Sequence, residues 1–467
     1  MNVPERSAFF SVKRFGPVPR KERVFLLKKT LLVFLIASLV LCLVSCAAAG
    51  TPLNGADVSL TSENDRRSDT EDLPATETGI DSKTDPPEET GEVSFPVLPA
   101  GATEGDVLSY FSRNVLAILA DLSGKNENLS FSPVSLYIAL SMASEGAAGD
   151  TVKAFSNVLC LPEGKTAADV CSLLLSILDR NGDRVKVSSA DAVWLAESLS
   201  ILPSFEEKIR TGYSADVYRA DFSTRKAVEE INSWVRKKTN GKIEGVLDEP
   251  NALIRMLLAN SVYLDAEWMY PFPAETFERP FYGTKETVSV PTMGQKMTVS
   301  YLSDDSRVAV ALPYAEGGLF FVAVCPRDGT APLSLYASEP VFSELLDSMS
   351  EGKAIVRLPK LEEKADMDLT EVLKNGGLRI AFSGLADFSE MSEESLCIDS
   401  VIQKTYVRVD EKGTEAAAVT VIDIRQTSVM EPEQPVELNF DHPFLWSIVD
   451  SETGIPLFVG IVNDLSD

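Results

Sequence analysis

Histidine and cysteine are few in this chain, and its 70 Asp and Glu residues show no pattern that singles out a catalytic pair. It has 467 residues but one histidine, His442, and six cysteines. A Ser-His-Asp or Cys-His catalytic pair would have to use His442, which stands directly before a proline and an apolar run, where we expect a structural role. A zinc site with several histidine ligands is excluded, and the sequence has no Walker motif, G-x-G-x-x-G or G-x-S-x-G. We therefore expect no enzyme activity, no metal and no cofactor.

Residues 410–430, DEKGTEAAAVTVIDIRQTSVM, offer a different kind of chemistry. A charged turn leads into three consecutive alanines, a β-branched run and a polar tail. β-Branched residues favour strand geometry, Gly413 allows a flexible hinge, and alanines offer no steric resistance to packed neighbours. Taken alone, the segment predicts an ordinary turn followed by a strand.

Charge excludes one class of partner. The formal net charge is −27, although residues 1–46 hold eight Lys/Arg against two Glu. Residues 47–100 hold twelve Asp/Glu against three Lys/Arg, and the remainder is strongly acidic as well. Such a surface is repelled by phosphates, so we expect no nucleic-acid partner.

Residues 1–46 are typical of a lipoprotein-type signal peptide. A basic pair precedes the apolar run 31–44, which is short for the roughly 20 residues of a membrane span. The sequence LVSC then resembles a bacterial lipobox in which Cys46 is the lipidated residue, and an uncleaved N-terminal anchor is the alternative. Either one predicts an extracytoplasmic protein, as a cell-surface lipoprotein or a secreted form. Residues 47–96 are polar and acidic, which predicts a disordered tether to the membrane.

From residue 97 onward the sequence has the composition of a globular domain. Residues 106–122 have apolar side chains at helical spacing, and Ser132-Pro133 is typical of a helix N-terminus. Residues 353–362, KAIVRLPKLE, are expected to form one strand. Helices dominate the first half and strands the second, without β-α-β alternation, so we predict an α+β fold with large, mostly antiparallel sheets and one domain, 97–467.

Six segments of this body resemble the serpins, the serine protease inhibitor family. The resemblance covers about residues 105–467 and comes in the family's order. The segments are NLSFSPVSLYIALSMASEGAAGDT (128–151), INSWVRKKTNGKIEGVL (231–247), LANSVYLDAEWMYPF (258–272), LPY with VRLPKLE (312–314, 356–362), VRVDEKGTEAAAVT (407–420) and FDHPFLWSIVDSETGIPLFVGIVND (440–464).

The resemblance implies that residues 410–430 belong to an exposed reactive-centre loop. In the family, a target protease cuts this loop and forms an acyl-enzyme, and the loop's N-terminal half then inserts as a strand into the central sheet. A proline or a charge within the hinge would block insertion, and between Gly413 and Ala418 the only charge is Glu415, which matches the acidic residue usual in the family. The implied hinge residues are Glu411, Gly413, Thr414, Glu415, Ala416, Ala417 and Ala418.

Five further positions match family sites beneath and above the central sheet. Ser132, Ser135 and Asn260 match the "shutter", where the sheet must open, and Trp268 matches the "breach" at its top. Gln403 stands where the family commonly has histidine. An amide still donates and accepts hydrogen bonds, so we expect the network to survive without a titratable group.

The scissile bond is not fixed by the sequence. The family's usual spacing from Glu411 gives Thr427-Ser428, with Arg425 as the second choice. Counting back from Phe440 places the bond near Met430 or Pro432, so the loop is about five residues longer than usual.

Three functions remain open at this point. The leading hypothesis is a monomeric, membrane-tethered suicide inhibitor of serine proteases, with cysteine proteases as a second target class. The first alternative is a non-inhibitory serpin-like binding protein, and the second is a secreted hydrolase on another fold.

Overall fold

The computed structural model describes residues 98–99, 101–124, 126–338, 342–414 and 434–465, without the side chains of residues 188–191, 259–261 and 337–338. The chain divides into two units, Met1–Asp85 and Pro86–Asp467, and every described element belongs to the second. The expected signal peptide (1–46) and tether (47–96) lie outside the described residues. No helix in the described part of the chain is long and apolar enough to cross a bilayer.

The described helices are α2 (Glu104–Ser123), α3 (Pro133–Ser144), α4 (Gly149–Val158), α5 (Ala167–Leu178), α6 (Pro203–Gly212), α7 (Arg225–Lys238), α8 (Pro332–Ser338), α9 (Phe342–Ser348) and α10 (Thr370–Leu373), the last followed by a π turn (Lys374–Leu378) and a 3₁₀ turn (Arg379–Phe382). The strands are β1 (Leu129–Phe131), β2 (Arg180–Asn181), β3 (Val185–Ala196), β4 (Asp216–Ala220), β5 (Met256–Glu267), β6 (Phe277–Tyr282), β7 (Thr287–Ser303), β8 (Arg307–Pro313), β9 (Leu319–Pro326), β10 (Ser350–Pro359), β11 (Leu361–Asp368), β12 (Ile402–Val409), β13 (Gly413–Thr414), β14 (Val436–Asn439), β15 (Phe444–Asp450) and β16 (Pro456–Val462).

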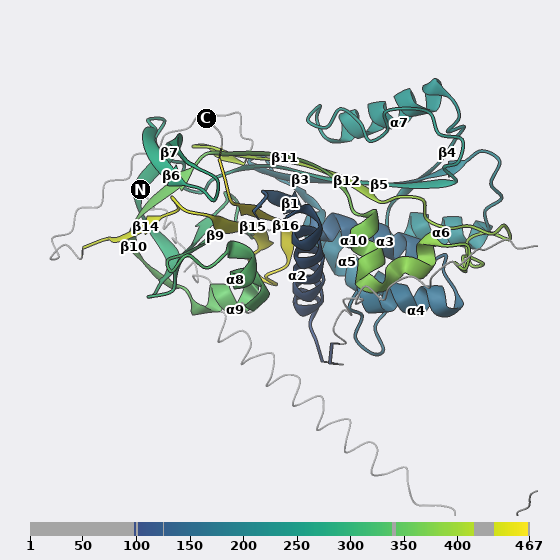
Figure 1. Cartoon of the computed structure of the whole chain (residues 1–467), viewed down its shortest axis with the longest axis horizontal. Coiled ribbons are helices and arrows are strands. Elements are labelled where there is room, and N and C mark those ends of the chain that lie inside the picture. The colour runs from purple at the N-terminus through teal and green to yellow at the C-terminus, as the bar shows by residue number, and fades with distance from the viewer. Residues whose placement is uncertain (1–97, 100, 125, 339–341, 415–433, 466–467) are drawn as a thin grey trace, which may run out of the picture. The chain divides into compact units, whose positions relative to one another are not determined.

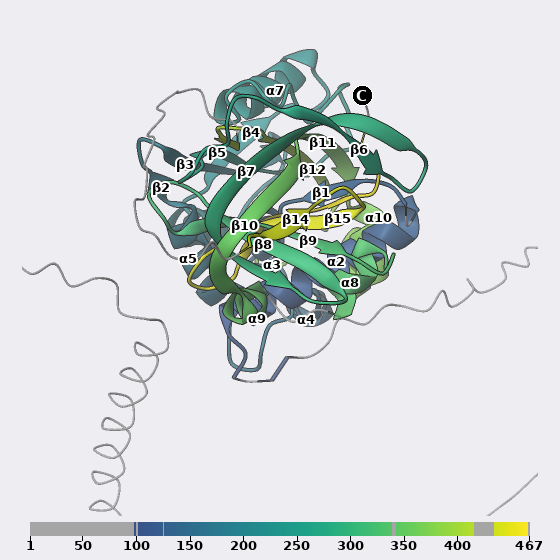
Figure 2. The same cartoon turned by 90° about the vertical axis from the view of Figure 1, so that its left-hand side faces the viewer.

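Two sheets organise these strands. A nine-stranded sheet has the order β1-β16-β15-β9-β8-β7-β10-β14, with β6 paired to β7, and Figure 2 shows it from the side of β7 and β10. A seven-stranded sheet has the order β11-β12-β13-β5-β3-β2, with β4 paired to β3. Pairing is antiparallel except for β3–β4 and β10–β14. The predicted α+β fold with large, mostly antiparallel sheets is therefore confirmed.

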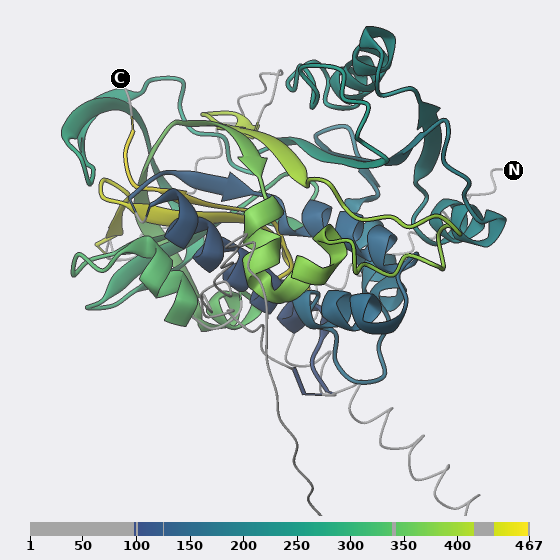
Figure 3. The ribbon, with the colours of Figure 1, turned by 45° about the vertical axis from the view of Figure 1, so that its right-hand side comes forward.

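Helices cover the seven-stranded sheet on both faces. Figure 1 shows α7 on one face and α3, α5 and α10 on the other, and Figure 3 shows the same layers from a second side. Local sequence starts some of these helices: Ser132 caps α3 by accepting a hydrogen bond from the Ser135 N–H, with Pro133 at the first position. Thr224 caps α7 in the same way, and three basic residues in its last turn favour the helix dipole.

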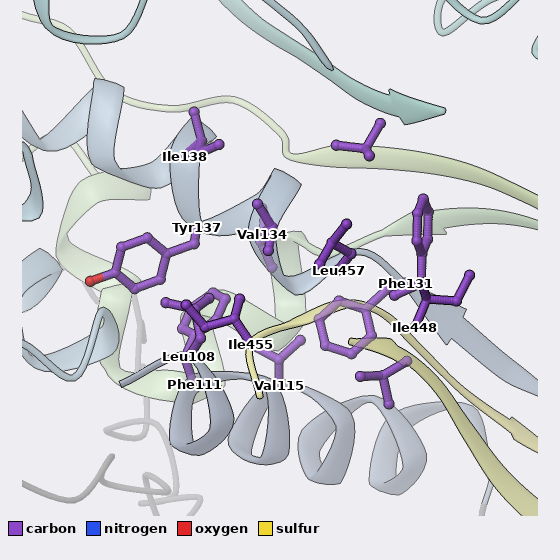
Figure 4. Close-up of a cluster of buried hydrophobic side chains, with 14 of the residues drawn as sticks. Leu108, Phe111, Val115, Phe131, Val134, Tyr137, Ile138, Ile448, Ile455 and Leu457 are labelled. Carbon is purple, nitrogen blue, oxygen red and sulfur yellow. The ribbon is translucent and has the colours of Figure 1, made fainter. Parts of the chain in front are cut away.

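The core between the two sheets and the helices is continuous. Figure 4 shows side chains of α2, α3, β1, β15 and β16 packed together. Its labelled residues are Leu108, Phe111, Val115, Phe131, Val134, Tyr137, Ile138, Ile448, Ile455 and Leu457, all at most 2% exposed. Burial on this scale is the main stabilising contribution to the fold.

One local prediction needs correction. Residues 353–362 do not form one strand, because the chain leaves β10 at Pro359 and enters β11 at Leu361, in the other sheet. The helical pattern after Ser132 divides at Glu145–Ala148 into α3 and α4. Among the four described cysteines no disulfide forms; Cys160, Cys171 and Cys325 are buried free thiols, whereas Cys397 is exposed.

Candidate functional site

The expected hinge begins inside the seven-stranded sheet. Thr414 pairs with Val409 of β12 on one side and with Ala266 of β5 on the other. Gly413 pairs with Glu267, so the two residues of β13 form a short strand between two long ones. The structure thus brings the start of the hinge into the top of the sheet that the resemblance identifies as its acceptor.

Close packing explains the residue types of β13. A Cβ on Gly413 would lie 2.0 Å from the Ala266 carbonyl oxygen, so any larger residue would force the strands apart. Thr414 is 2% exposed, and its hydroxyl bonds that of Tyr314. Burial holds the pKa of Tyr314 well above its usual range, so its hydroxyl stays protonated.

Trp268 donates hydrogen bonds to the residues just before β13. Its indole N–H donates to the Asp410 carbonyl at 2.8 Å, and its backbone N–H donates to the Lys412 carbonyl at 2.8 Å. The indole is 1% exposed and stacks on Tyr314 with ring centroids 4.6 Å apart. Trp268 therefore binds the residues just before β13, and Tyr314, which stacks on it, binds Thr414 within β13.

An ion pair lies at the same end of the sheet. The Glu411 carboxylate lies 2.8 Å from the Lys360 ammonium, and Glu411 is the less exposed partner. Lys360 is the single residue between β10 and β11, where the chain changes sheets. The Glu411 carbonyl also accepts from the Phe272 N–H at 2.8 Å.

Beneath the sheet, Gln403 and Ser132 form a two-point amide pair. The Gln403 side-chain oxygen accepts from the Ser132 N–H at 2.9 Å, and its NH₂ donates to the Ser132 carbonyl at 3.0 Å. The Ser132 hydroxyl donates to the Leu457 carbonyl of β16 at 2.7 Å. This network ties β12 to the N-terminus of α3 and to the nine-stranded sheet with no titratable group.

Below β13 the two long strands are not joined to each other. Along the described backbone of β12 and β5, no ladder pairs one strand directly with the other, and β13 alone bonds to both. We call the position between β12 and β5 below β13 the open position. β12 and β5 lie side by side there without a ladder, so a further strand could pair with both only after the two strands move apart.

Several predicted site residues lie outside the described residues. These are Glu415, Ala416, Ala417, Ala418, Arg425, Thr427, Ser428, Met430 and Cys46. Asn260 lies on β5 opposite Asp191 of β3, and its side chain is not described. Ser135 is buried and takes part through its backbone N–H, which donates to the Ser132 hydroxyl at 3.3 Å.

Sequence reasoning missed the partners of these residues. Tyr314 and Lys360 lie within the quoted LPY and VRLPKLE segments, but nothing in those segments indicates their contacts with Thr414 and Glu411. Leu457 contributes only a backbone carbonyl, which no residue type can indicate.

His442 takes part in none of the contacts around β13 described above. Its ring stacks on Tyr282 with centroids 4.9 Å apart, and Nδ1 lies 2.8 Å from an Asp441 carboxylate oxygen. It borders an open pocket of about 500 Å³ that also includes Cys325 and Arg327. Burial raises the pKa of the Cys325 thiol to about 12, which leaves it a poor nucleophile.

The profile of the serpin (serine protease inhibitor) family matches residues 107–465. The chain belongs to the serpin family. An uncharacterized serpin-like protein of Thermococcus kodakarensis is 33% identical over 380 residues, which cover 80% of this chain and 89% of that protein.

Solved serpin structures show the same fold. Native tengpin, a thermophilic serpin, matches with a TM-score of 0.69 and 27% identity, over 80% of this chain and 97% of its own. Human thyroxine-binding globulin, solved with thyroxine, matches with a TM-score of 0.69 and 26% identity, over 78% of this chain and 99% of its own. The serpin fold excludes the hypothesis of a hydrolase on another fold, and membership places the chain in a family of protease inhibitors.

Proposed function

We propose that this serpin is a suicide inhibitor of serine proteases, with cysteine proteases as a second target class. The protease cleaves the loop after residue 414, and the loop's N-terminal half then enters the open position before the acyl-enzyme is hydrolysed. The observation that carries the proposal is the seven-stranded sheet itself. Gly413–Thr414 already bonds to β12 and β5 at the top, and no ladder joins those two described strands below.

The energetic argument follows from the hydrogen bonds. An inserted strand would gain backbone partners on both of its edges, in a buried and largely antiparallel setting. The uncleaved loop cannot reach that arrangement while both of its ends are fixed, at Thr414 and at β14. Cleavage releases one end, so the chain can move to the more stable state and carry the attached protease with it.

The deciding experiment combines complex formation with thermal unfolding. We expect the full-length protein to form SDS-stable complexes with at least one protease of a panel with subtilisin-, trypsin-, elastase- and chymotrypsin-like specificities. We also expect a large rise in melting temperature once the loop is cut, because the inserted strand completes the sheet. Cleavage by every protease of the panel without complexes and without that rise would overturn the proposal.

The same experiment locates the scissile bond. Mass spectrometry of the fragment released from a complex should place the cut at Thr427-Ser428, with Arg425 next in order and Met430 third. A trypsin-like target would favour Arg425, and an elastase-like or subtilisin-like target would favour Thr427.

The second candidate is a non-inhibitory, ligand-binding serpin. It draws support from the open pocket beside His442 and from the family member that was solved with thyroxine. This function predicts a loop that is cut without a rise in melting temperature, together with a small molecule that raises the melting temperature of the uncut protein.

We propose further that Cys46 carries a lipid and that residues 47–96 tether a monomeric inhibitor outside the cytoplasm. The proposal rests on the basic, apolar and LVSC order of the N-terminal sequence. Metabolic labelling with a fatty-acid analogue should mark the wild type and not Cys46→Ala, and the label should follow the membrane fraction. Equal labelling of both proteins would overturn it.

A further inference from the structure

A short segment on the outer face of the seven-stranded sheet spans the open position. Residues 239–247, here called the strap, follow α7 and lead toward β5. Within the strap, the Lys242 ammonium lies 5.2 Å from the centre of the Tyr406 ring, on β12. This is the distance of a cation–π contact.

The strap is hydrogen-bonded to α7. The Asn232 side chain of α7 accepts from the backbone N–H groups of Val246 and Leu247 at 2.8 and 3.1 Å, and donates to the Leu247 carbonyl at 2.6 Å. At its start, the Thr239 hydroxyl donates to the Val235 carbonyl of α7 at 2.9 Å. These bonds fix the strap to the helix at both of its ends.

The helix in turn is fixed to the β5 side of the open position. Trp234 of α7 meets Trp194 of β3 and Tyr218 of β4 edge to face, each with ring centroids 6.3 Å apart. Trp194 and Tyr218 themselves stack at 4.4 Å. The strap, α7, β3, β4 and β5 therefore form one mechanical body, and Figure 1 shows α7 lying over these strands.

Tyr406 lies on the other side of the open position, where β11 and β12 form the second body. β12 is paired with β11 along its whole length, and Tyr406 stands opposite Lys364 in that ladder. The Lys364 ammonium lies 5.6 Å from the same ring, so Tyr406 faces two cations, one from each body. An open pocket of about 430 Å³ separates the strap and α7 from Lys404, the neighbouring outward residue of β12, so the bodies are not closely packed there.

We infer that Lys242 is a positioning residue which holds β12 and β5 together from outside and slows the entry of a strand into the open position. The inference rests on the proposed function and adds to it a residue that sets the rate. Insertion widens the distance between the two bodies, so it must break the Lys242–Tyr406 contact. The Lys364–Tyr406 contact lies within one body and survives.

The test measures the entry of a synthetic strand, independently of any protease. The probe is an N-acetylated peptide with the chain's own sequence from Thr414 to Ile424, mixed with the full-length protein. Incorporation is followed as the fraction that unfolds at the higher, strand-filled melting temperature. A surface cation–π contact of 0.5–1 kcal/mol corresponds to roughly a two- to five-fold change in rate, so we expect Lys242→Gln to accelerate incorporation by about that factor.

Lys364→Gln is the matched control, because it removes an equal charge from the same ring without crossing the open position. We expect it to leave the rate unchanged. Tyr406→Leu should be accelerated like Lys242→Gln, and combining the two should add nothing further, because both remove one contact. A purely structural role of Lys242 would lower stability without this non-additivity.

The outcomes separate the two proposals. Peptide entry at the same rate into the wild type, Lys242→Gln and Lys364→Gln would overturn the role of Lys242 and leave the inhibitor function standing. Equal acceleration by both lysine variants would also overturn it, because charge alone would then be the cause. Failure of the peptide to enter the wild type or any variant would overturn both proposals.

Discussion

The two sheets of this serpin differ in how completely their strands are paired. In the nine-stranded sheet, each neighbour along the path from β1 to β14 is joined by a ladder of three or more residue pairs. In the seven-stranded sheet, no ladder joins β12 to β5 along their described length, and only the two residues of β13 bond to both strands. The first sheet is thus paired between all neighbours on its path, whereas the second lacks a ladder between two strands that lie side by side.

Under the proposed mechanism, that difference marks the place where the entry of a further strand would release free energy. A sheet whose hydrogen-bonding edges face an open position is less stable than the same sheet with that position filled. The contacts around the open position then act as restraints rather than as permanent packing. They lie at the top (Trp268, Tyr314, Lys360), beneath (Gln403) and outside (Lys242), and changes there should affect strand entry as well as stability.

The largest effect is expected when a charge is placed at the top of the open position. Thr414→Arg must bury a guanidinium at a site that is 2% exposed, which costs several kcal/mol without a partner. We expect the loop still to be cut but no SDS-stable complex to form. Thr414→Val, of nearly the same size, should retain complexes. Wild-type amounts of complex with Thr414→Arg would show that β13 is not the entry point.

The next effect concerns the support beneath the sheet. Gln403→Leu leaves the buried N–H of Ser132 unpaired and removes one of the two bonds to its carbonyl, which keeps the Leu136 N–H; the two losses should lower the free energy of unfolding of the uncut protein by about 2–4 kcal/mol. Thr405→Val is the matched control. Thr405 is the next inward residue of β12, and its buried hydroxyl has no hydrogen-bond partner among the described residues, so we expect a change near zero. Urea unfolding of both variants measures the difference, and equal losses would refute a specific role for Gln403.

Two buried tryptophans, one in each sheet region, test the comparison directly. Trp268 and Trp446 are each 1% exposed, but Trp268 donates to the Asp410 carbonyl, whereas the Trp446 N–H has no partner in the described structure. We expect Trp268→Phe to cost about 2–3 kcal/mol and Trp446→Phe less, because only the first leaves a buried carbonyl unpaired. Only Trp268→Phe should also change the rate of peptide entry. A change in that rate with Trp446→Phe would contradict the division into a completed and an incomplete sheet.

The smallest effect is expected at the seam between the sheets. Glu363 of β11 lies beside Asn128, which stands directly before β1, and burial raises the pKa of the Glu363 carboxyl from 4.5 to about 7. The folded state therefore binds the proton more tightly than the unfolded state, so this group stabilises the fold below pH 4.5, and the contribution is lost as the pH rises toward 7.

Glu363→Gln should remove that loss. Partial exposure reduces the effect, so we expect the variant to be more stable than the wild type by on the order of 1–2 kcal/mol at pH 8 and about equal to it at pH 4.5. Thermal melts across this pH range measure the difference. Parallel curves for the two proteins would contradict a buried Glu363.

Much of this architecture was predictable from local sequence. Ser132-Pro133 marks the start of α3 because the cap and the proline satisfy the helix N-terminus within four residues. The hairpins of β8–β9 and β15–β16 follow from apolar runs around glycine turns. The hinge was assigned from the resemblance to the family, because its residue types taken alone predict an ordinary turn and strand.

Tertiary structure alone decided the rest. KAIVRLPKLE reads as one strand because every local preference within it is extended, and its division between two sheets depends on partners at β7 and β12 that lie far away in the sequence. Likewise, Thr414 needs Tyr314, Glu411 needs Lys360, and Gln403 needs the backbone of Ser132. The sequence determined which segments could become strands. Only long-range packing determined that β13 lies between β12 and β5 and that no ladder joins those two strands below it, because backbone pairing between distant strands leaves no mark on residue type.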